Sequence, residues 1–291
     1  MSGQDKLELY YLIRDRNFGI YKKTEQEKIR KAKICVAGQG CVGELAAAVL
    51  ARIGFGLIRI IDQDNLELSN LNRNSFAVYS KLGRPKTKNM LEFLNDATAK
   101  TVKIEVMNEM VNTKNAESAF KGINVIVQGI DNMYSRVIIH RVARKLGIPV
   151  VTMSGGPPYR AFVSTVLPKG IDYETMFNLP TKSLDLDIPS EELGKLHHKL
   201  RGKRVKYAIT HGADKEWGKF YLSGERQTWA ITPERAYITA TLQAHETVNL
   251  VLGRPLMAKA PKIISIDLLD KKNIATVRSP KKGKYWDYKV W

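Results

Sequence analysis

The chain has 291 residues, with 47 Lys and Arg against 29 Asp and Glu, which gives a formal net charge of +18. This length suits one large α/β domain, alone or with an extension. No apolar stretch reaches the roughly 20 residues of a membrane span, and residues 1–16 contain no apolar signal-peptide core. We therefore expect a cytoplasmic protein that does not associate with a membrane.

The N-terminal part contains the first clear motif. Residues 1–32 are expected to be mostly helical, since the spacing of Thr24 and Glu27 matches a helix capping box. An apolar strand over 34–37 then leads into a helix over 44–53. Three glycines make the turn between them in a GxGxxG pattern: Gly38, Gly40 and Gly43. Such a turn lets a phosphate approach the backbone and the free N–H groups of the helix N-terminus.

A second strand over 58–61 ends at Asp62, where a carboxylate can hold the hydroxyls of a ribose. Together with the glycine turn, this carboxylate indicates a nucleotide-binding unit. These two features alone fit NAD as well as ATP.

After a polar loop over 65–82, the expected strands and helices alternate. The strands are placed at 102–106, 125–129, 149–153 and 162–167, and the helices at 85–94, 114–120 and 134–146. Alternation implies right-handed crossovers and a parallel sheet. The carboxyl ends of the strands then bring Gly38, Asp62 and Asp131 to one edge. The expected fold class is α/β, a Rossmann-like, doubly wound and mostly parallel sheet.

The pattern changes near residue 168. Residues 168–224 are rich in Pro, Gly and charge and have weak periodicity, whereas 233–252 is a clear amphipathic helix and 262–278 reads as a closing hairpin. We expect residues 1–167 to form the nucleotide-binding domain with an N-terminal helical segment. Residues 168–291 are expected to be a crossover region and a C-terminal antiparallel extension, packed on the same domain.

The positive charge is concentrated in two stretches. Residues 195–206 carry six Lys and Arg and no acid, and residues 254–291 carry ten Lys and Arg against three Asp. Such patches suit a polyanion, for instance tRNA, or an acidic protein. A basic surface that faces only solvent explains them equally well.

Three further motifs make the nucleotide reading more specific. They are Ser-Asn-Leu-Asn-Arg-Asn at 69–74, Gly-Arg-Pro-Lys at 83–86 and Gln-Gly-Ile-Asp-Asn at 128–132. With these motifs in order, the chain resembles the ThiF/MoeB/HesA family of adenylating domains, which are related to ubiquitin-activating enzymes. The resemblance runs from about residue 14 to 165, and a weaker similarity continues at 233–255.

The resemblance implies an ATP-dependent adenylyltransferase that uses Mg²⁺ and activates a carboxylate. Asp62 would contact the ribose, Lys86 the phosphates, and Asp131 the Mg²⁺. The loop residues Asn70 and Arg73 would also contact ATP, and Asp64 is a further candidate. Both reactants are anionic, so positioning and positive charge are what the reaction needs.

Family members usually form homodimers in which an N-terminal arginine reaches the ATP of the partner. Arg14 and Arg16 are the two candidates, and the sequence leaves the choice open. An arginine there would act on the phosphates as an arginine finger does.

The chain departs from many relatives in its cysteines. Residues 170–229 contain none, and the two CxxC pairs of zinc-bearing relatives are missing, so we expect no zinc and no enzyme thioester. Cys35 is expected inside a strand. Cys41 lies in the glycine turn, where N–H groups could lower its pKa, but packing is favoured over nucleophilic attack.

The leading hypothesis is therefore activation of the C-terminal glycine of a small ubiquitin-like or sulfur-carrier protein. One alternative is a tRNA-modifying dehydratase of the threonylcarbamoyladenosine type, which needs no cysteine and explains the basic surface. The other is a non-catalytic nucleotide-binding protein or an NAD-binding Rossmann protein. The motifs at Arg73, Lys86 and Asp131 argue against the last of these.

Overall fold

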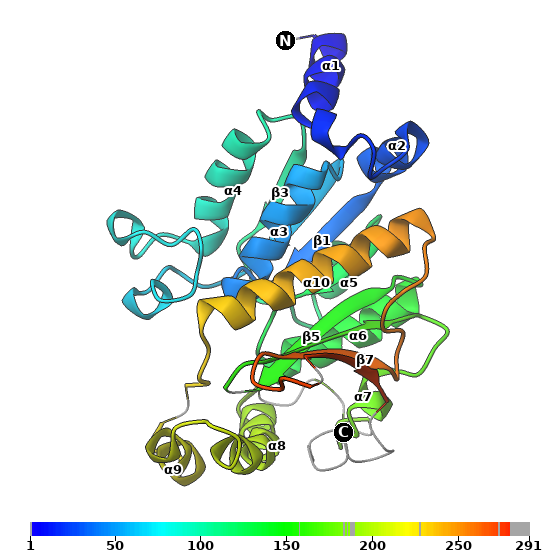
Figure 1. The fold of residues 1–291 in the computed structure, drawn as a ribbon. Helices are drawn as coiled ribbons and strands as arrows, with labels where there is room; N and C mark the ends of the chain where they lie inside the picture. Colours follow the sequence, from blue (N-terminus) through cyan, green and yellow to red (C-terminus); the bar gives the residue numbers. More distant parts are fainter. Residues whose placement is uncertain are drawn as a thin grey trace.

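The computed structural model describes residues 2–156, 158–182, 184, 186, 190–226, 228–272 and 274–279, without the side chain of Ser190. Its centre is an eight-stranded sheet in the order β3-β2-β1-β4-β5-β6-β7-β8 (Figure 1). The strands are β1 (Lys33–Ala37), β2 (Leu57–Ile61), β3 (Lys103–Met107), β4 (Val125–Gln128), β5 (Val150–Gly156), β6 (Arg160–Val166), β7 (Ile263–Asp267) and β8 (Ala275–Arg278).

The sheet combines a parallel and an antiparallel part, as the sequence predicted. Strands β1 to β5 pair in parallel, and β6, β7 and β8 pair in antiparallel fashion. β1 lies between β2 and β4, so the strand order reverses there. In open parallel sheets a ligand binds outside the carboxyl ends of the strands at such a reversal. The expected α/β, Rossmann-like class is confirmed.

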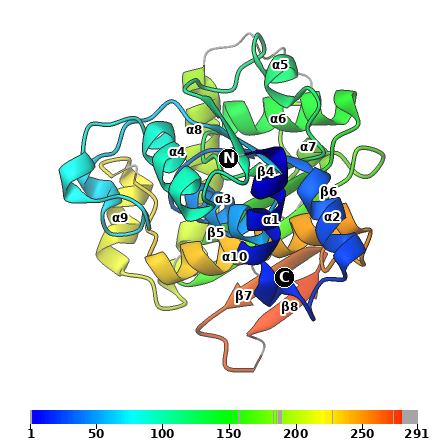
Figure 2. The same cartoon turned by 90° about the horizontal axis from the view of Figure 1, so that it is seen from above.

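Helices cover both faces of the sheet (Figures 1 and 2). They are α1 (Gly3–Ile13), α2 (Lys23–Lys31), α3 (Cys41–Ile53), α4 (Lys86–Ala97), α5 (Ala116–Phe120), α6 (Met133–Leu146), α7 (Tyr173–Met176), α8 (Ser190–Ile209), α9 (Lys215–Ser223) and α10 (Pro233–Leu252). Because strand side chains alternate, Ile34 and Val36 pack with α3 and α10, while Cys35 and Ala37 pack with α5 and α6. The result is a three-layer arrangement.

Helix α10 connects the late part of the chain to α3 and the parallel part of the sheet. It packs along α3, as the orange and blue helices of Figure 1 show. Gln243 Nε2 donates to the carbonyl oxygens of Gln128 at 2.9 Å and Val151 at 3.0 Å, which ties α10 to β4 and β5. Strand β7 extends the same sheet beside β6.

Some local expectations were wrong. Helix α3 begins at Cys41, three residues earlier than expected, with Gly40 as its N-cap. The capping box is not formed by Thr24 and Glu27, because α2 begins one residue before Thr24 and Glu25 Oε2 accepts from the Lys22 N–H at 2.9 Å.

The stretch 168–224, in which the sequence shows only weak periodicity, forms α7, α8 and α9. Helix α8 carries charged residues both on its exposed face and toward a cavity described below. Its buried face mixes apolar residues such as Leu193 and Leu200 with the polar residues His197 and Arg204, so its sequence shows only weakly the periodicity that signals an amphipathic helix.

None of the described helices has both the length and the apolar character needed to cross a membrane. The end of the second basic stretch, residues 280–291, lies outside the described part of the chain.

Candidate active site

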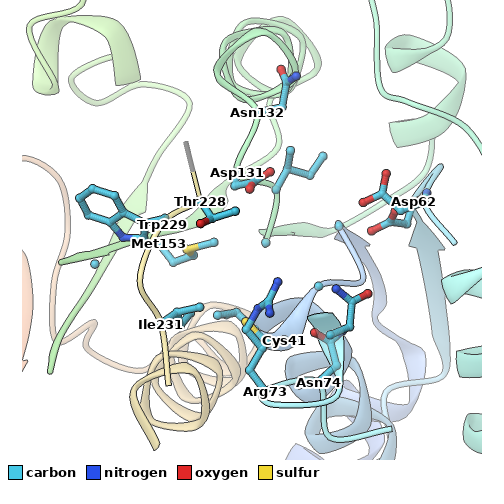
Figure 3. Close-up of a pocket in the computed structure, with 18 of the residues that line it drawn as sticks. Cys41, Asp62, Arg73, Asn74, Asp131, Asn132, Met153, Thr228, Trp229 and Ile231 are labelled. Carbon is cyan, nitrogen blue, oxygen red and sulfur yellow. Dashed lines mark hydrogen bonds between the residues drawn. The ribbon is translucent and has the colours of Figure 1, made fainter. Parts of the chain in front are cut away.

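A cavity of about 1010 Å³ opens at the carboxyl ends of β1, β2, β4 and β5. Figure 3 shows Asp131 between two groups of side chains, with Asp62 on one side and Trp229 and Met153 on the other. We call the side next to β1 and β2 the nucleotide end. The side next to β5 and α8 is the acceptor end.

The three glycines of the turn have different physical roles. Gly38 has a φ of 93°, and a Cβ there would lie 2.8 Å from Gly129 C, so the residue is required by both conformation and packing. A Cβ on Gly43 would lie 1.8 Å from Gly38 O. Gly40 meets nothing within 4 Å, and it leaves the N-terminus of α3 open to the cavity. This division is what a phosphate-binding turn requires.

Asp62 is fixed against the glycine turn. Its Oδ2 accepts from the Gln39 N–H at 2.5 Å and its Oδ1 from the Asp64 N–H at 2.7 Å. Burial raises the pKa of the Asp62 carboxyl, and these hydrogen bonds and the Lys86 charge oppose that rise. The carboxylate therefore stands at the end of β2, beside the turn.

Lys86 and Asp64 form an ion pair at the edge of the nucleotide end. Lys86 Nζ lies 2.8 Å from Asp64 Oδ2, and Lys86 is buried while Asp64 is exposed. Because Lys86 is the first residue of α4, its backbone position is set by the Pro85 N-cap. An anionic ligand can compete with Asp64 for this ammonium group.

The loop after β2 supplies the remaining predicted groups of this end. Asn70 is buried and its Oδ1 accepts from the Glu67 N–H at 3.2 Å, so it shapes the loop. Arg73 donates to Ser69 O and to Asn72 Oδ1 at 2.8 Å, and it lines the cavity. Figure 3 shows Arg73 beside Cys41 at the base of the cavity.

The buried carboxyl group of Glu44 accepts hydrogen bonds from this loop. Glu44 on α3 is 1% exposed, and it accepts from Asn74 Nδ2 at 3.2 Å and from the Phe76 N–H at 3.3 Å. Burial is the largest effect on it and raises its pKa to about 7. No motif or spacing in the sequence singled out this residue.

Asp131 is an exposed acid on the cavity wall. It does not cap α6, because Asn132 is the N-cap and its Oδ1 accepts from the Ser135 N–H at 3.1 Å. Arg136 is buried one turn into the helix and its Nε donates to Ile130 O at 2.6 Å. The loop that carries Asp131 is therefore held from both sides, and its carboxylate faces the cavity.

The acceptor end contains residues that the sequence analysis did not identify as a site. His197, Arg201 and Arg204 of α8 line it, together with Arg235 of α10. The three α8 residues are spaced i, i+4 and i+7, which is one helical face. Residues 195–206 had been interpreted as one basic patch, and helical spacing was the signal that could have separated this face from the lysines.

Aromatic side chains of α9 and the following segment complete the acceptor end. Trp217 and Trp229 line the cavity, with ring centroids 5.9 Å apart and planes at 74°. The Arg201 guanidinium lies 5.0 Å from the Trp229 ring centroid. Ser154 and Gly155 at the end of β5 form the wall beneath them.

Cys41 lines the cavity at the start of α3, but its electrostatics differ from the expectation. Burial raises the pKa of the Cys41 thiol, with Arg73 and Arg235 opposing the rise. The Val42 N–H does lower this pKa, but desolvation is the larger effect, so the expectation of a lowered pKa was wrong. Cys35 is fully buried in β1, and burial raises the pKa of its thiol to about 12.

The two N-terminal arginines lie outside this cavity and in different environments. Arg14 is 3% exposed and donates to Tyr10 O at 3.0 Å, Ala51 O at 3.0 Å and Thr101 Oγ1 at 3.2 Å. Its guanidinium is thus used within its own chain. Arg16 is exposed, and this difference favours Arg16 as the residue that could reach another chain.

The ThiF family profile matches residues 12–286. Among curated proteins, the adenylyltransferase and sulfurtransferase UBA4 of Saccharomyces cerevisiae is 32% identical over 158 residues, which cover 49% of this chain and 36% of UBA4. The tRNA threonylcarbamoyladenosine dehydratase of Escherichia coli is 30% identical over 137 residues, which cover 47% of this chain and 51% of that protein. The chain thus matches only a third to a half of these relatives.

Among solved structures, Escherichia coli MccB with selenomethionine MccA matches with a TM-score of 0.69 and 18% identity, over 94% of this chain and 72% of that one. MccB with ATP matches with a TM-score of 0.62 and 18% identity, over 88% of this chain and 65% of that one. At this level of identity the likeness is one of fold.

Proposed function

The chain belongs to the ThiF family, and we propose that it is an ATP-dependent adenylyltransferase that activates a carboxylate. One observation carries the proposal: a single cavity brings together the glycine turn, Asp62, Arg73, Lys86 and Asp131. These residues come from separate motifs along the chain. An NAD-binding protein has no need of this combination of cations and a second carboxylate.

The reaction follows from the charges of this cavity. A carboxylate oxygen attacks the α-phosphorus of ATP, the bond to the β-phosphate oxygen breaks, and pyrophosphate leaves. The attacking carboxylate is already ionised at neutral pH, so no general base is needed. Lys86 and Arg73 stabilise the charge on the phosphates, and the open N-terminus of α3 offers N–H groups to them.

Asp62 and Asp131 are proposed for two different tasks. Asp62, fixed by the Gln39 N–H, would hold the ribose hydroxyls. Asp131 fits a Mg²⁺ ligand, because its exposed carboxylate faces the cavity and is not used as a helix cap. Mg²⁺ held there with phosphate oxygens and waters would supply positive charge that the triphosphate requires.

We propose as substrate the C-terminal carboxylate of a small ubiquitin-like or sulfur-carrier protein. The name of UBA4, an adenylyltransferase and sulfurtransferase, supports this class. The only cysteines of the chain are Cys35 and Cys41, and both are buried thiols with raised pKa values. The proposed product is therefore the free acyl-adenylate rather than an enzyme thioester.

The active form is proposed to be a homodimer in which Arg16 reaches the phosphates of the partner's ATP. The surface around Arg16 supports this, since large apolar side chains are exposed beside it in sequence: Leu12 is 65%, Phe18 73% and Ile20 69% exposed. Exposed apolar groups of this size on one short segment are typical of an interface.

A tRNA-modifying dehydratase is the second candidate, and one observation favours it. Lys195, Lys199, Lys203 and Lys206 form an exposed stripe along α8, next to the cavity. A stripe of this kind suits a phosphate backbone, and one relative carries that enzyme's name.

The test is calorimetric binding of ATP with Mg²⁺ beside NAD⁺, followed by ATP–pyrophosphate exchange. Exchange is measured with a small protein that ends in Gly-Gly and with tRNA that carries threonylcarbamoyladenosine. ATP binding with exchange that depends on the small protein supports the leading proposal, and exchange or product formation with tRNA supports the second. Binding of NAD⁺ but not ATP overturns both.

A further inference from the structure

The acceptor end of the cavity is strongly cationic. Guanidinium groups from α6, α8 and α10 line it, namely those of Arg136, Arg201, Arg204 and Arg235, and Arg226, which follows α9, lines the cavity as well. Most of the acids that line the cavity within the described part of the chain lie elsewhere. Asp62, Asp64 and Glu67 follow β2, and Glu109 follows β3. Only Asp131 follows β4, beside these arginines.

The positive charges of this end lie close enough to act on one another. Burial lowers the pKa of His197 well below its usual value, and the charges of Arg201, Arg136 and Arg204 lower it further. Burial also lowers the pKa of Arg201, with Arg136 adding to the effect and Asp131 opposing it. The helix face of α8 and the start of α6 thus share one poorly solvated, positively charged region.

The two α8 arginines are held in defined positions. Arg204 is 1% exposed, and its Nη1 donates to Ser154 Oγ at 2.8 Å and Gly155 O at 3.4 Å. Its guanidinium lies 5.5 Å from the Phe162 ring centroid, and that of Arg201 lies 5.0 Å from the Trp229 ring centroid. Groups fixed in this way lose little conformational freedom when they bind a ligand.

A poorly solvated region lined by several guanidinium groups favours an anionic group of a ligand. The phosphates of ATP already have Arg73 and Lys86 at the other end of the cavity. A planar guanidinium matches a carboxylate through two parallel hydrogen bonds.

We propose that Arg201 and Arg204 bind a second carboxylate of the substrate, next to the one that is activated. The substrate is then a peptide or protein segment with an acidic residue close to its reacting carboxyl group. This inference rests on the proposed function, because it names the substrate class of the same site.

The placement of the charges favours an acidic chain end over RNA. Lysines that could follow a phosphate backbone, such as Lys199 and Lys203, lie on the exposed face of α8. Arg204 is buried and Arg201 half-buried at the cavity wall. The cavity of about 1010 Å³ must hold a nucleotide as well, so what reaches these arginines is a short end and not a polymer backbone.

The test compares two acetylated hexapeptides that end in glycine, one with Glu-Glu and one with Gln-Gln before it. Their affinities are measured by calorimetry with a saturating non-hydrolysable ATP analogue at an ionic strength of roughly 0.15 M. The Glu peptide is expected to bind about tenfold tighter, the effect of one good charge-assisted contact. A 12-nucleotide oligouridine serves as the RNA probe.

The variants are Arg201→Gln and Arg204→Gln, with Lys203→Gln as the matched control on the exposed face of the same helix. Both arginine variants are expected to abolish the preference for the Glu peptide, and Lys203→Gln to retain it. If the buried Arg204 is needed for folding, Arg201→Gln alone decides. Unchanged affinity for the ATP analogue checks that the nucleotide end is intact.

Several results overturn the inference. These are equal or undetectable binding of the two peptides, a preference that survives Arg201→Gln, or an equal loss in Lys203→Gln. Loss of oligouridine binding but not of Glu-peptide binding in Arg201→Gln assigns the arginines to RNA instead. Failure of the wild type to bind ATP overturns the proposed function, which is a separate outcome.

Discussion

The two ends of the cavity are assembled in different ways. The nucleotide end comes from one stretch of chain between Gly38 and Lys86, and its polar groups are paired with one another at short distances, as in Asp62 with Gln39 and Lys86 with Asp64. The acceptor end brings together α6, α8 and α10, and its wall is dominated by guanidinium groups.

This difference shows which part of the site forms from local structure and which part depends on the packing of the whole fold. A strand, a glycine turn and a helix place backbone N–H groups with little help from the rest of the chain. Long arginine side chains on separate helices are positioned only when those helices pack. We therefore expect the nucleotide end to set ATP binding and the acceptor end to set the choice of carboxylate.

Asp131 lies where the two ends meet, so its replacement should have the largest effect. Asp131→Asn removes the charge that we propose to hold Mg²⁺ and is expected to lower pyrophosphate exchange about 10²–10³-fold. The melting temperature should stay unchanged, since Asp131 is exposed and does not cap α6. Asp96→Asn, an exposed acid on α4 outside the cavity, is the matched control. Wild-type exchange in Asp131→Asn would show that the carboxylate has no role.

Glu44 should make the nucleotide end sensitive to pH. Its pKa rises from 4.5 to about 7 in the folded protein, so folding takes up a proton between these values. The free energy of unfolding should then fall as pH rises from 4.5 to 7, by an amount on the order of 3 kcal/mol. Glu44→Gln should remove this slope.

The measurement is urea unfolding of the wild type and Glu44→Gln at pH 5 and pH 8. Glu105→Gln is the control, because hydrogen bonds from Lys103 and Arg59 lower the pKa of Glu105 and move its titration below this window. Parallel pH profiles for the wild type and Glu44→Gln contradict the assignment.

Two glycine variants test which positions of the turn are needed for stability and which are needed for ligand binding. Gly43→Ala should destabilise the protein by about 1–3 kcal/mol, because its methyl group would lie 1.8 Å from Gly38 O. Gly40→Ala has open space within 4 Å and should change the melting temperature little. It should instead weaken ATP binding about tenfold, since the methyl group obstructs the approach to α3. Equal effects of both variants on stability, with ATP affinity retained, would speak against a phosphate-binding turn.

Variants of Arg14 and Arg16 test whether a second chain contributes an arginine to the site. Neither residue lines the cavity of its own chain. Arg14→Ala should lower stability by about 2–3 kcal/mol, because buried hydrogen-bond acceptors lose their donor. Arg16→Ala should leave stability unchanged and lower exchange about tenfold.

Mixing Arg16→Ala with Asp131→Asn should restore part of the exchange activity, because a mixed dimer contains one complete site. No recovery after co-refolding, or a monomeric wild type in light scattering, rules out this contribution in trans.

The sequence by itself determined the nucleotide end. The alternation of strands and helices, the glycine turn and the strand-end positions of Asp62 and Asp131 predicted the parallel sheet and its ligand edge, because these depend on short-range patterns and one topological rule. The motifs also indicated Arg73 and Lys86, which the fold brings to the same cavity.

Only the tertiary structure decided the rest. It buried Arg14 and left Arg16 exposed, raised the pKa of Cys41 through desolvation, and assigned the α6 cap to Asn132. It also turned one face of the basic stretch 195–206 into a wall of the cavity. The physical reason is the same throughout: burial and long-range neighbours, which set charge and accessibility, arise only when distant segments pack.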